Sequence, residues 1–200
     1  MGCNQIRRWF KVRVLFIDNP GFTYNLVDEF EKRDCESVVY RNDVDMKAID
    51  NAIKSFKPKL IVISGYGKDA GNSVDIIQSY QGQIPIFGIG FGCECIIEAF
   101  EGKVNRSPVI NHGNVTRISH DDKTIFKKLD NPFAAGVYNS LSASDVPYDL
   151  EVSARNENDI VMGIRHKECF VEGIQFDPSS LLTVSGSLII DNLLREVGKK

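Results

Sequence analysis

In the first half of the chain, short apolar runs alternate with segments that have helical spacing. In the segment 22–32, for example, Phe22, Leu26 and Phe30 fall on one helical face, and charged residues fall elsewhere. The apolar runs lack the alternation of a half-exposed strand, which is typical of parallel strands buried on both faces. The pattern predicts strands at 12–17, 38–40, 60–64 and 84–87, and helices at 22–32, 46–56 and 74–80.

After Gly102 the pattern changes to apolar runs separated by short turns, and only the last segment, 187–197, again has helical spacing. Strands that alternate with helices, followed by strands joined by turns, indicate an α/β fold. We expect an open, mostly parallel sheet flanked by helices, with an added antiparallel β portion in the second half. We also expect a tail at 1–11 and a single domain over 12–200. The predicted strands of the second half are 115–119, 135–141, 150–154, 160–165 and 170–175.

Composition narrows the function classes. The chain has 200 residues, 42% of them hydrophobic, which is enough for a full core. Its net charge of −3 gives no basic surface for nucleic acid, and no apolar run approaches the length of a membrane span. The five cysteines are odd in number and lack CxxC spacing. We therefore expect reduced thiols in a cytoplasmic protein, with no metal, no cofactor and no nucleic-acid or membrane partner.

The strand ends locate a candidate site. In open α/β sheets, ligands bind at the carboxyl ends of the parallel strands. Four loops follow predicted strands in this way, at 18–23, 64–71, 88–94 and 175–180. The second of them is rich in glycine, but Lys68 is not in a phosphate-loop frame, so we do not expect a nucleotide there.

The third loop has the frame of a nucleophile elbow without a nucleophile. Such an elbow is a tight strand-to-helix turn, Gly-x-nucleophile-x-Gly, in which small flanking residues are required. Here the frame is Gly88-x-Gly90-x-Gly92, preceded by an apolar strand and followed by a helical segment. Gly90 can adopt the strained backbone of the central position, but it has no side chain that could attack a substrate.

Several further segments match one family in the same order along the chain. Ile17-Asp18-Asn19 opens the series, and the elbow segment 85–92 and Tyr138-Asn139-Ser140-Leu141 follow. The segment 172–180, Glu-Gly-Ile-Gln-Phe-Asp-Pro-Ser-Ser, is similar to the signature Gly-Val-Gln-Phe-His-Pro-Glu-Ser. Over roughly 12–197 the chain resembles class I glutamine amidotransferases, most closely the glutaminase subunit of anthranilate synthase and its aminodeoxychorismate synthase relative. The resemblance implies their flavodoxin-like fold.

The resemblance also implies which residues would carry catalysis. In the family a cysteine attacks the glutamine amide, a histidine moves the proton and a glutamate orients the histidine. These positions fall on Gly90, Asp177 and Ser179, so all three catalytic groups are replaced. We therefore expect negligible hydrolysis of glutamine. A bulky Tyr66 stands where the family presents bare backbone to the substrate. The family's substrate-pocket positions fall on Gly65, Gly67, Phe91, Glu94, Ser140 and Leu141.

Alternatives remain open at two of these places. Cys93 follows the elbow by about one helical turn and is an alternative nucleophile, although a small packed residue is the simpler interpretation. Asp177 and Ser179 form either a polar pair in a retained pocket or solvated turn residues, of which we favour the second.

Two classes of function follow from these observations. The favoured class is a non-catalytic pseudo-glutaminase that binds a chorismate-using synthase as a partner-binding or regulatory subunit, with a possible small ligand in the retained pocket. The alternatives are an enzyme of altered chemistry that uses Cys93 or Asp177, and a free-standing small-molecule binder.

Overall fold

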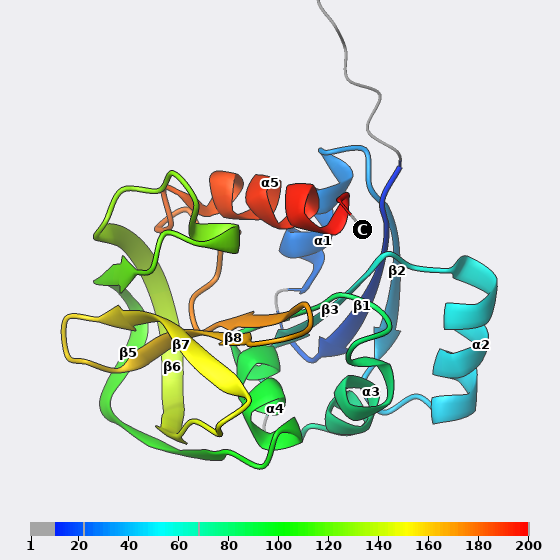
Figure 1. Ribbon diagram of the computed structural model, residues 1–200, viewed down its shortest axis with the longest axis horizontal. Helices are drawn as coiled ribbons and strands as arrows, with labels where there is room; N and C mark the ends of the chain where they lie inside the picture. Colours follow the sequence, from blue (N-terminus) through cyan, green and yellow to red (C-terminus); the bar gives the residue numbers. More distant parts are fainter. Residues whose placement is uncertain (1–10, 22, 68, 200) are drawn as a thin grey trace, which may run out of the picture.

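The structure is a computed structural model that describes residues 11–199, except Phe22 and Lys68. The side chains of 110–112 and 139 are also left undescribed. Residues 1–10 of the expected tail therefore lie outside the described part of the chain. Within this part, nine strands form one sheet in the order β2-β1-β3-β4-β9-β8-β7-β5-β6 (Figure 1).

Five strands of the sheet are parallel and carry the site at their carboxyl ends. Each pairs with its neighbour in parallel register; Gly88 of β4, for example, lies opposite Gly173 of β9. Four of them come from the first half of the chain, and β9 returns from the second half to extend the parallel set. The parallel strands are β1 (Arg13–Asn19), β2 (Glu36–Arg41), β3 (Leu60–Gly65), β4 (Ile86–Ile89) and β9 (Val171–Ile174).

Antiparallel strands make up the rest of the sheet, as the turn-rich second half predicts. Two of them are much longer than the predicted runs, because they continue through polar segments that lack an apolar signal. They are also interrupted by three register shifts where they pair with each other. The antiparallel strands are β5 (Lys103–His120), β6 (Phe133–Asp145), β7 (Leu150–Asn156) and β8 (Val161–His166).

Helices cover both faces of the parallel strands, and side-chain alternation within each strand defines the two cores. In β1, Val14 and Phe16 join the core formed with α1 and α5, whereas Leu15 and Ile17 join the core formed with α2, α3 and α4. This arrangement confirms the predicted open, mostly parallel sheet flanked by helices. The helices are α1 (Thr23–Glu31), α2 (Met46–Phe56), α3 (Ser73–Tyr80), α4 (Phe91–Ala99) and α5 (Gly186–Val197), with a 3-10 turn, η1, at Thr124–Phe126.

A buried hydrogen-bond network fixes the loops that leave β1 and β3. The side-chain amide of Asn19 donates to the carbonyl of Ser64 (3.1 Å), and its oxygen accepts from the Asn42 amide (2.9 Å) and the Ser73 hydroxyl (3.0 Å). The hydroxyl groups of Thr23 and Ser64 lie 2.8 Å apart. Because buried polar groups are costly unless they are paired, this network holds the start of α1 against the end of β3.

No helix within the described residues is long and apolar enough to cross a membrane.

Candidate functional site

The elbow between β4 and α4 keeps the backbone geometry that its glycine pattern predicts. Gly90 precedes the first residue of α4 and has φ 59° and ψ −117°, a conformation that side chains disfavour. Its N–H donates to the carbonyl of Ile174 (2.8 Å), and its carbonyl accepts from the N–H of Cys93 (2.9 Å). The turn is therefore anchored both to β9 and to the first turn of the helix.

The three glycines of the elbow differ in how much room they have. A Cβ at Gly92 would lie 2.0 Å from the carbonyl oxygen of Ile63, and one at Gly88 would lie 2.5 Å from the oxygen of Gly92. A Cβ at Gly90 would meet only the oxygen of Gly65, at 3.3 Å. The flanking glycines are thus required for close packing, whereas the central one leaves space on the side where a nucleophile would project.

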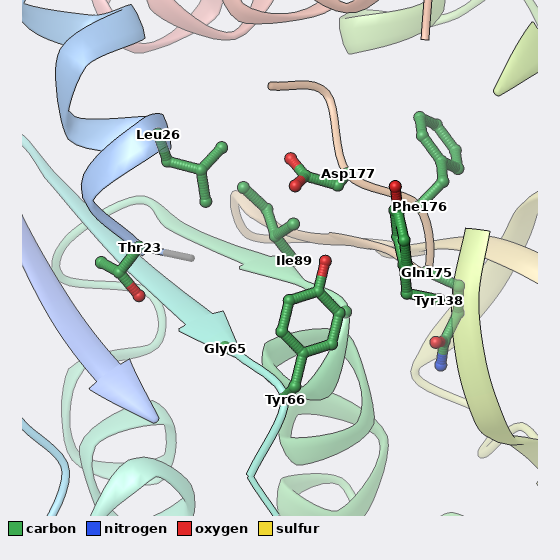
Figure 2. A pocket seen from close by; sticks show the side chains of 10 residues that line it. Thr23, Leu26, Gly65, Tyr66, Ile89, Tyr138, Gln175, Phe176 and Asp177 are labelled. Atoms are coloured by element: carbon green, nitrogen blue, oxygen red, sulfur yellow. The ribbon is translucent and has the colours of Figure 1, made fainter. Parts of the chain in front are cut away.

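That space opens into a pocket at the carboxyl ends of the parallel strands (Figure 2). All four loops that follow the predicted strands contribute to it. The volume open to the centre of a water molecule is only about 10 Å³, roughly the room for one water. The residues that line the pocket are Thr23, Leu26, Gly65, Tyr66, Ile89, Gly90, Tyr138, Gln175, Phe176 and Asp177.

Tyr66 takes up much of the pocket. Its side chain extends from the loop after β3 into the space beside Ile89, and its ring meets the ring of Tyr138 edge-on, with centroids 6.0 Å apart. Its backbone N–H donates to the carbonyl of Pro20 (3.4 Å), so this amide is not directed at a ligand. Burial, and then the nearby charge of Asp177, raise the pKa of Tyr66, so its hydroxyl stays protonated.

Asp177 lies inside the pocket and not in a solvated turn. Only 9% of its surface is exposed. One carboxylate oxygen accepts both the N–H of Ser179 (2.8 Å) and its hydroxyl (2.7 Å). The interpretation of Asp177 as a solvated turn residue is therefore wrong, because the loop after β9 folds back over the strand ends. The two residues form a hydrogen-bonded pair instead.

Cys93 lies on the opposite side of the elbow turn from the pocket. Its side chain has no exposed surface, and it faces β9, where a Cβ on Gly173 would lie 2.9 Å from its sulfur. Burial raises the pKa of the Cys93 thiol well above its ordinary value, which suppresses the reactive thiolate. The structure therefore gives no support to Cys93 as a displaced nucleophile. It is a core residue, as is Cys95.

Glu94 is a buried carboxyl group in the first turn of α4. Burial raises its pKa to about 7, and a hydrogen bond with the side chain of Gln175 partly offsets this effect. Gln175 lines the pocket, so Glu94 supports the pocket from below without lining it. The group is poised to change its charge near neutral pH.

The remaining predicted pocket positions are dispersed. Gly65 lines the pocket, and its φ of 126° and close approach to Asn19 require a glycine. Gly67 and Phe91 lie next to each other beside the pocket, since a Cβ on Gly67 would be 3.6 Å from the Phe91 ring. Ser140 and Leu141 are in β6 and do not belong to the lining.

Several lining residues have no counterpart among the predicted site positions. Thr23 and Leu26 come from the first turn of α1, and Ile89 from the end of β4. Tyr138 and the pair Gln175-Phe176 lie in the matched segments 138–141 and 172–180, which is the signal that locates them in the sequence. Among the described residues, no group of three or more His, Cys, Asp or Glu side chains is placed to hold a metal ion.

An open parallel sheet with a strand–elbow–helix turn and a pocket above its strand ends defines an α/β protein of the nucleophile-elbow class. The chain belongs to the class-I glutamine amidotransferase family, which matches residues 15–197.

Relatives and solved structures agree with this assignment. The chain is 39% identical to anthranilate synthase component 2 of Haemophilus influenzae, covering 88% of this chain and 93% of that one. It is 40% identical to the same component of Methanocaldococcus jannaschii, covering 90% and 91%. It is 38% identical to a multifunctional tryptophan biosynthesis protein of Pichia angusta over 92% of this chain, but it spans only 52% of that protein.

The fold is similar to that of a putative GMP synthase protein from Thermoplasma acidophilum. The TM-score is 0.79 at 21% identity, covering 95% of this chain and 98% of that one. A glutamine amidotransferase from Thermotoga maritima gives a TM-score of 0.72 at 13% identity, covering 95% and 99%.

Proposed function

We propose that this chain is a non-catalytic, glutaminase-like subunit that binds a chorismate-using synthase. The observation that carries the proposal is the elbow, which keeps its strained backbone and the space for a side chain while its centre is Gly90. The positions of the base and its orienting partner hold Asp177 and Ser179, which are hydrogen-bonded to each other. In a nucleophile–base–orienter mechanism, loss of the nucleophile alone costs several orders of magnitude in rate.

The relatives indicate the kind of partner. Those named above are components of anthranilate synthase, or tryptophan biosynthesis proteins. Their names favour the anthranilate branch, and hence tryptophan biosynthesis, over the aminodeoxychorismate branch and folate biosynthesis. A synthase paired with this chain would take free ammonia in place of glutamine nitrogen. A cytoplasmic location belongs to the same proposal.

Exposed apolar side chains beside the pocket support a protein partner. Leu181 is fully exposed and Val184 nearly so, and both follow directly on the loop that carries Asp177. Tyr24 is mostly exposed and adjoins Thr23, which lines the pocket. Because exposed apolar patches often mark interaction sites, this rim is where we expect the synthase to bind.

The catalytic half of the proposal is tested by incubating the purified chain with glutamine and measuring ammonia by a coupled glutamate dehydrogenase assay. We expect no release above the rate of a buffer blank. Treatment with a glutamine-analogue electrophile, followed by peptide mass spectrometry, should give no adduct on Cys93. Turnover of glutamine, or a stoichiometric adduct on Cys93, would contradict the non-catalytic assignment.

The partner half is tested by co-expression with the synthase from the same organism and capture through a tag on this chain. We expect a stable complex with ammonia-dependent synthase activity. Leu181→Asp should weaken the complex at least about tenfold, because it places a charge in an apolar interface. Tyr148→Asp is the matched control, since Tyr148 is also highly exposed but adjoins the far end of α4 through Pro147 and Gly102. Equal effects of the two variants would exclude the pocket rim as the docking site.

A further inference from the structure

Asp177 presents a buried carboxylate that the described part of the chain leaves half satisfied. Both hydrogen bonds from Ser179 go to Oδ1. Within the described residues, no hydrogen bond reaches Oδ2, and no ion pair with lysine or arginine includes Asp177. A carboxylate that is nine-tenths buried without a positive partner is costly, so the site favours an occupant that supplies positive charge.

The groups around this oxygen are acceptors and aromatic rings. Figure 2 shows the carboxylate of Asp177 and the hydroxyl of Tyr66 pointing into the same space, with Leu26 and Ile89 beside it. Tyr138 adds a second phenol to the lining. None of the ten lining residues in the described chain is cationic. Carboxylates, phenol oxygens and aromatic faces all attract a small cation, and an anion would be repelled.

The size of the space limits the class of ligand further. It accepts one centre the size of a water molecule. Divalent metal ions require several carboxylates or a full shell of oxygen ligands, and the described residues contain no such group. An ion of this size that donates hydrogen bonds in several directions fits best, because Oδ2 and the tyrosine oxygens lie on different sides.

We propose that the pocket between Asp177 and Tyr66 binds an ammonium ion. The carboxylate supplies the counter-charge and accepts one N–H, and the phenol oxygens accept others. This inference goes beyond the proposed function, because it concerns the isolated chain and needs neither a synthase partner nor a reaction. It assigns to Asp177 a binding role in place of the catalytic role of the residue it replaces.

Isothermal titration of the whole purified chain with ammonium chloride tests the proposal, with tetramethylammonium chloride holding the ionic strength constant. We expect saturable binding, several-fold tighter for ammonium than for potassium, which has the same charge and a similar size but no N–H group. Crystals soaked in rubidium chloride should show an anomalous peak beside Oδ2 of Asp177, since rubidium occupies a site of ammonium size at high concentration.

Asp177→Asn removes the charge while it keeps an oxygen that can accept the bonds from Ser179. We expect it to weaken ammonium binding at least about tenfold without changing the circular dichroism spectrum. Asp159→Asn is the matched control, because that carboxylate is exposed in the turn before β8 and the variant should bind like the wild type. Equal affinity for ammonium and potassium, absence of saturation, or unchanged binding by Asp177→Asn would each overturn the assignment.

Discussion

The elbow turn and the loop that follows β9 face each other across one pocket, but different parts of the chain hold them in place. The elbow, residues 88–92, is held by main-chain contacts so close that Gly88 and Gly92 have no room for a Cβ. The loop from Asp177 to Val184 is held by hydrogen bonds between short side chains, and it ends in exposed apolar residues. The backbone frame of an amidotransferase site is therefore tied to the stability of the fold, whereas the groups that face the pocket are not. Chemistry can be lost from such a site without loss of the scaffold.

The largest expected effect separates the flanking glycines of the elbow from the central one. Gly92→Ala should lower the free energy of unfolding by at least about 3 kcal/mol, because its Cβ would overlap the Ile63 carbonyl, a main-chain atom. Gly90→Ala should cost only about 1–2 kcal/mol, which is the strain of its backbone conformation. Urea denaturation followed by circular dichroism measures both. Similar costs for the two variants would remove the distinction between frame and centre.

A somewhat smaller, pH-dependent effect is expected from Glu94, which lies under the pocket. Its pKa is raised to about 7 in the folded chain from an ordinary value of 4.5. The unfolded chain therefore loses this proton first as the pH rises, and stability falls between about pH 4.5 and pH 7, by up to about 3 kcal/mol. Glu94→Gln should remove this fall, so the variant should be more stable than the wild type at pH 8 and similar to it at pH 4.

Glu98→Gln is the control for this measurement, because Glu98 is exposed on the same helix. Its unfolding curve should keep the wild-type dependence on pH. If Glu94→Gln also kept that dependence, the buried carboxyl group would not be its source.

The smallest expected effect is that of returning a nucleophile to the elbow. Gly90→Cys has room for its side chain but finds no histidine at Asp177, and Tyr66 fills the space where a substrate would bind. Release of ammonia from glutamine should therefore stay at the level of the blank, although the new thiol should be alkylated by iodoacetamide faster than the buried Cys93. Measurable turnover by this single variant would show that the pocket still binds glutamine.

The parallel half of the fold can be predicted closely from the sequence, and the antiparallel half only in outline. Buried parallel strands are continuous apolar runs, so the pattern predicts β3 at 60–64, and the strand ends one residue later. By contrast, the pattern predicts β5 only at 115–119, but the strand begins at Lys103. Its first part contains Asn105, Pro108 and Asn111 and pairs with β6 through irregular register, so tertiary pairing determines it and local pattern does not.

At the site, the sequence locates the loops but not the directions of the side chains. The strand ends predict which four loops meet, because the carboxyl ends of parallel strands share one edge of the sheet. Whether Tyr66 turns into the pocket, and whether Cys93 turns away from it, depends on the packing of α4 against β9. The burial of Asp177 depends likewise on how the last loop folds back, which no local pattern encodes.

The position of the Cys93 sulfur against Gly173 has a practical consequence. A thiol reagent can reach this sulfur only when α4 separates from β9, so the rate at which Cys93 is alkylated in the native protein measures the free energy of that local opening. The same residue that is too enclosed to act as a nucleophile is thus a natural chemical probe of how tightly the elbow stays closed. A ligand or partner that binds over the pocket would be detected as slower labelling, with no label added to the protein beforehand.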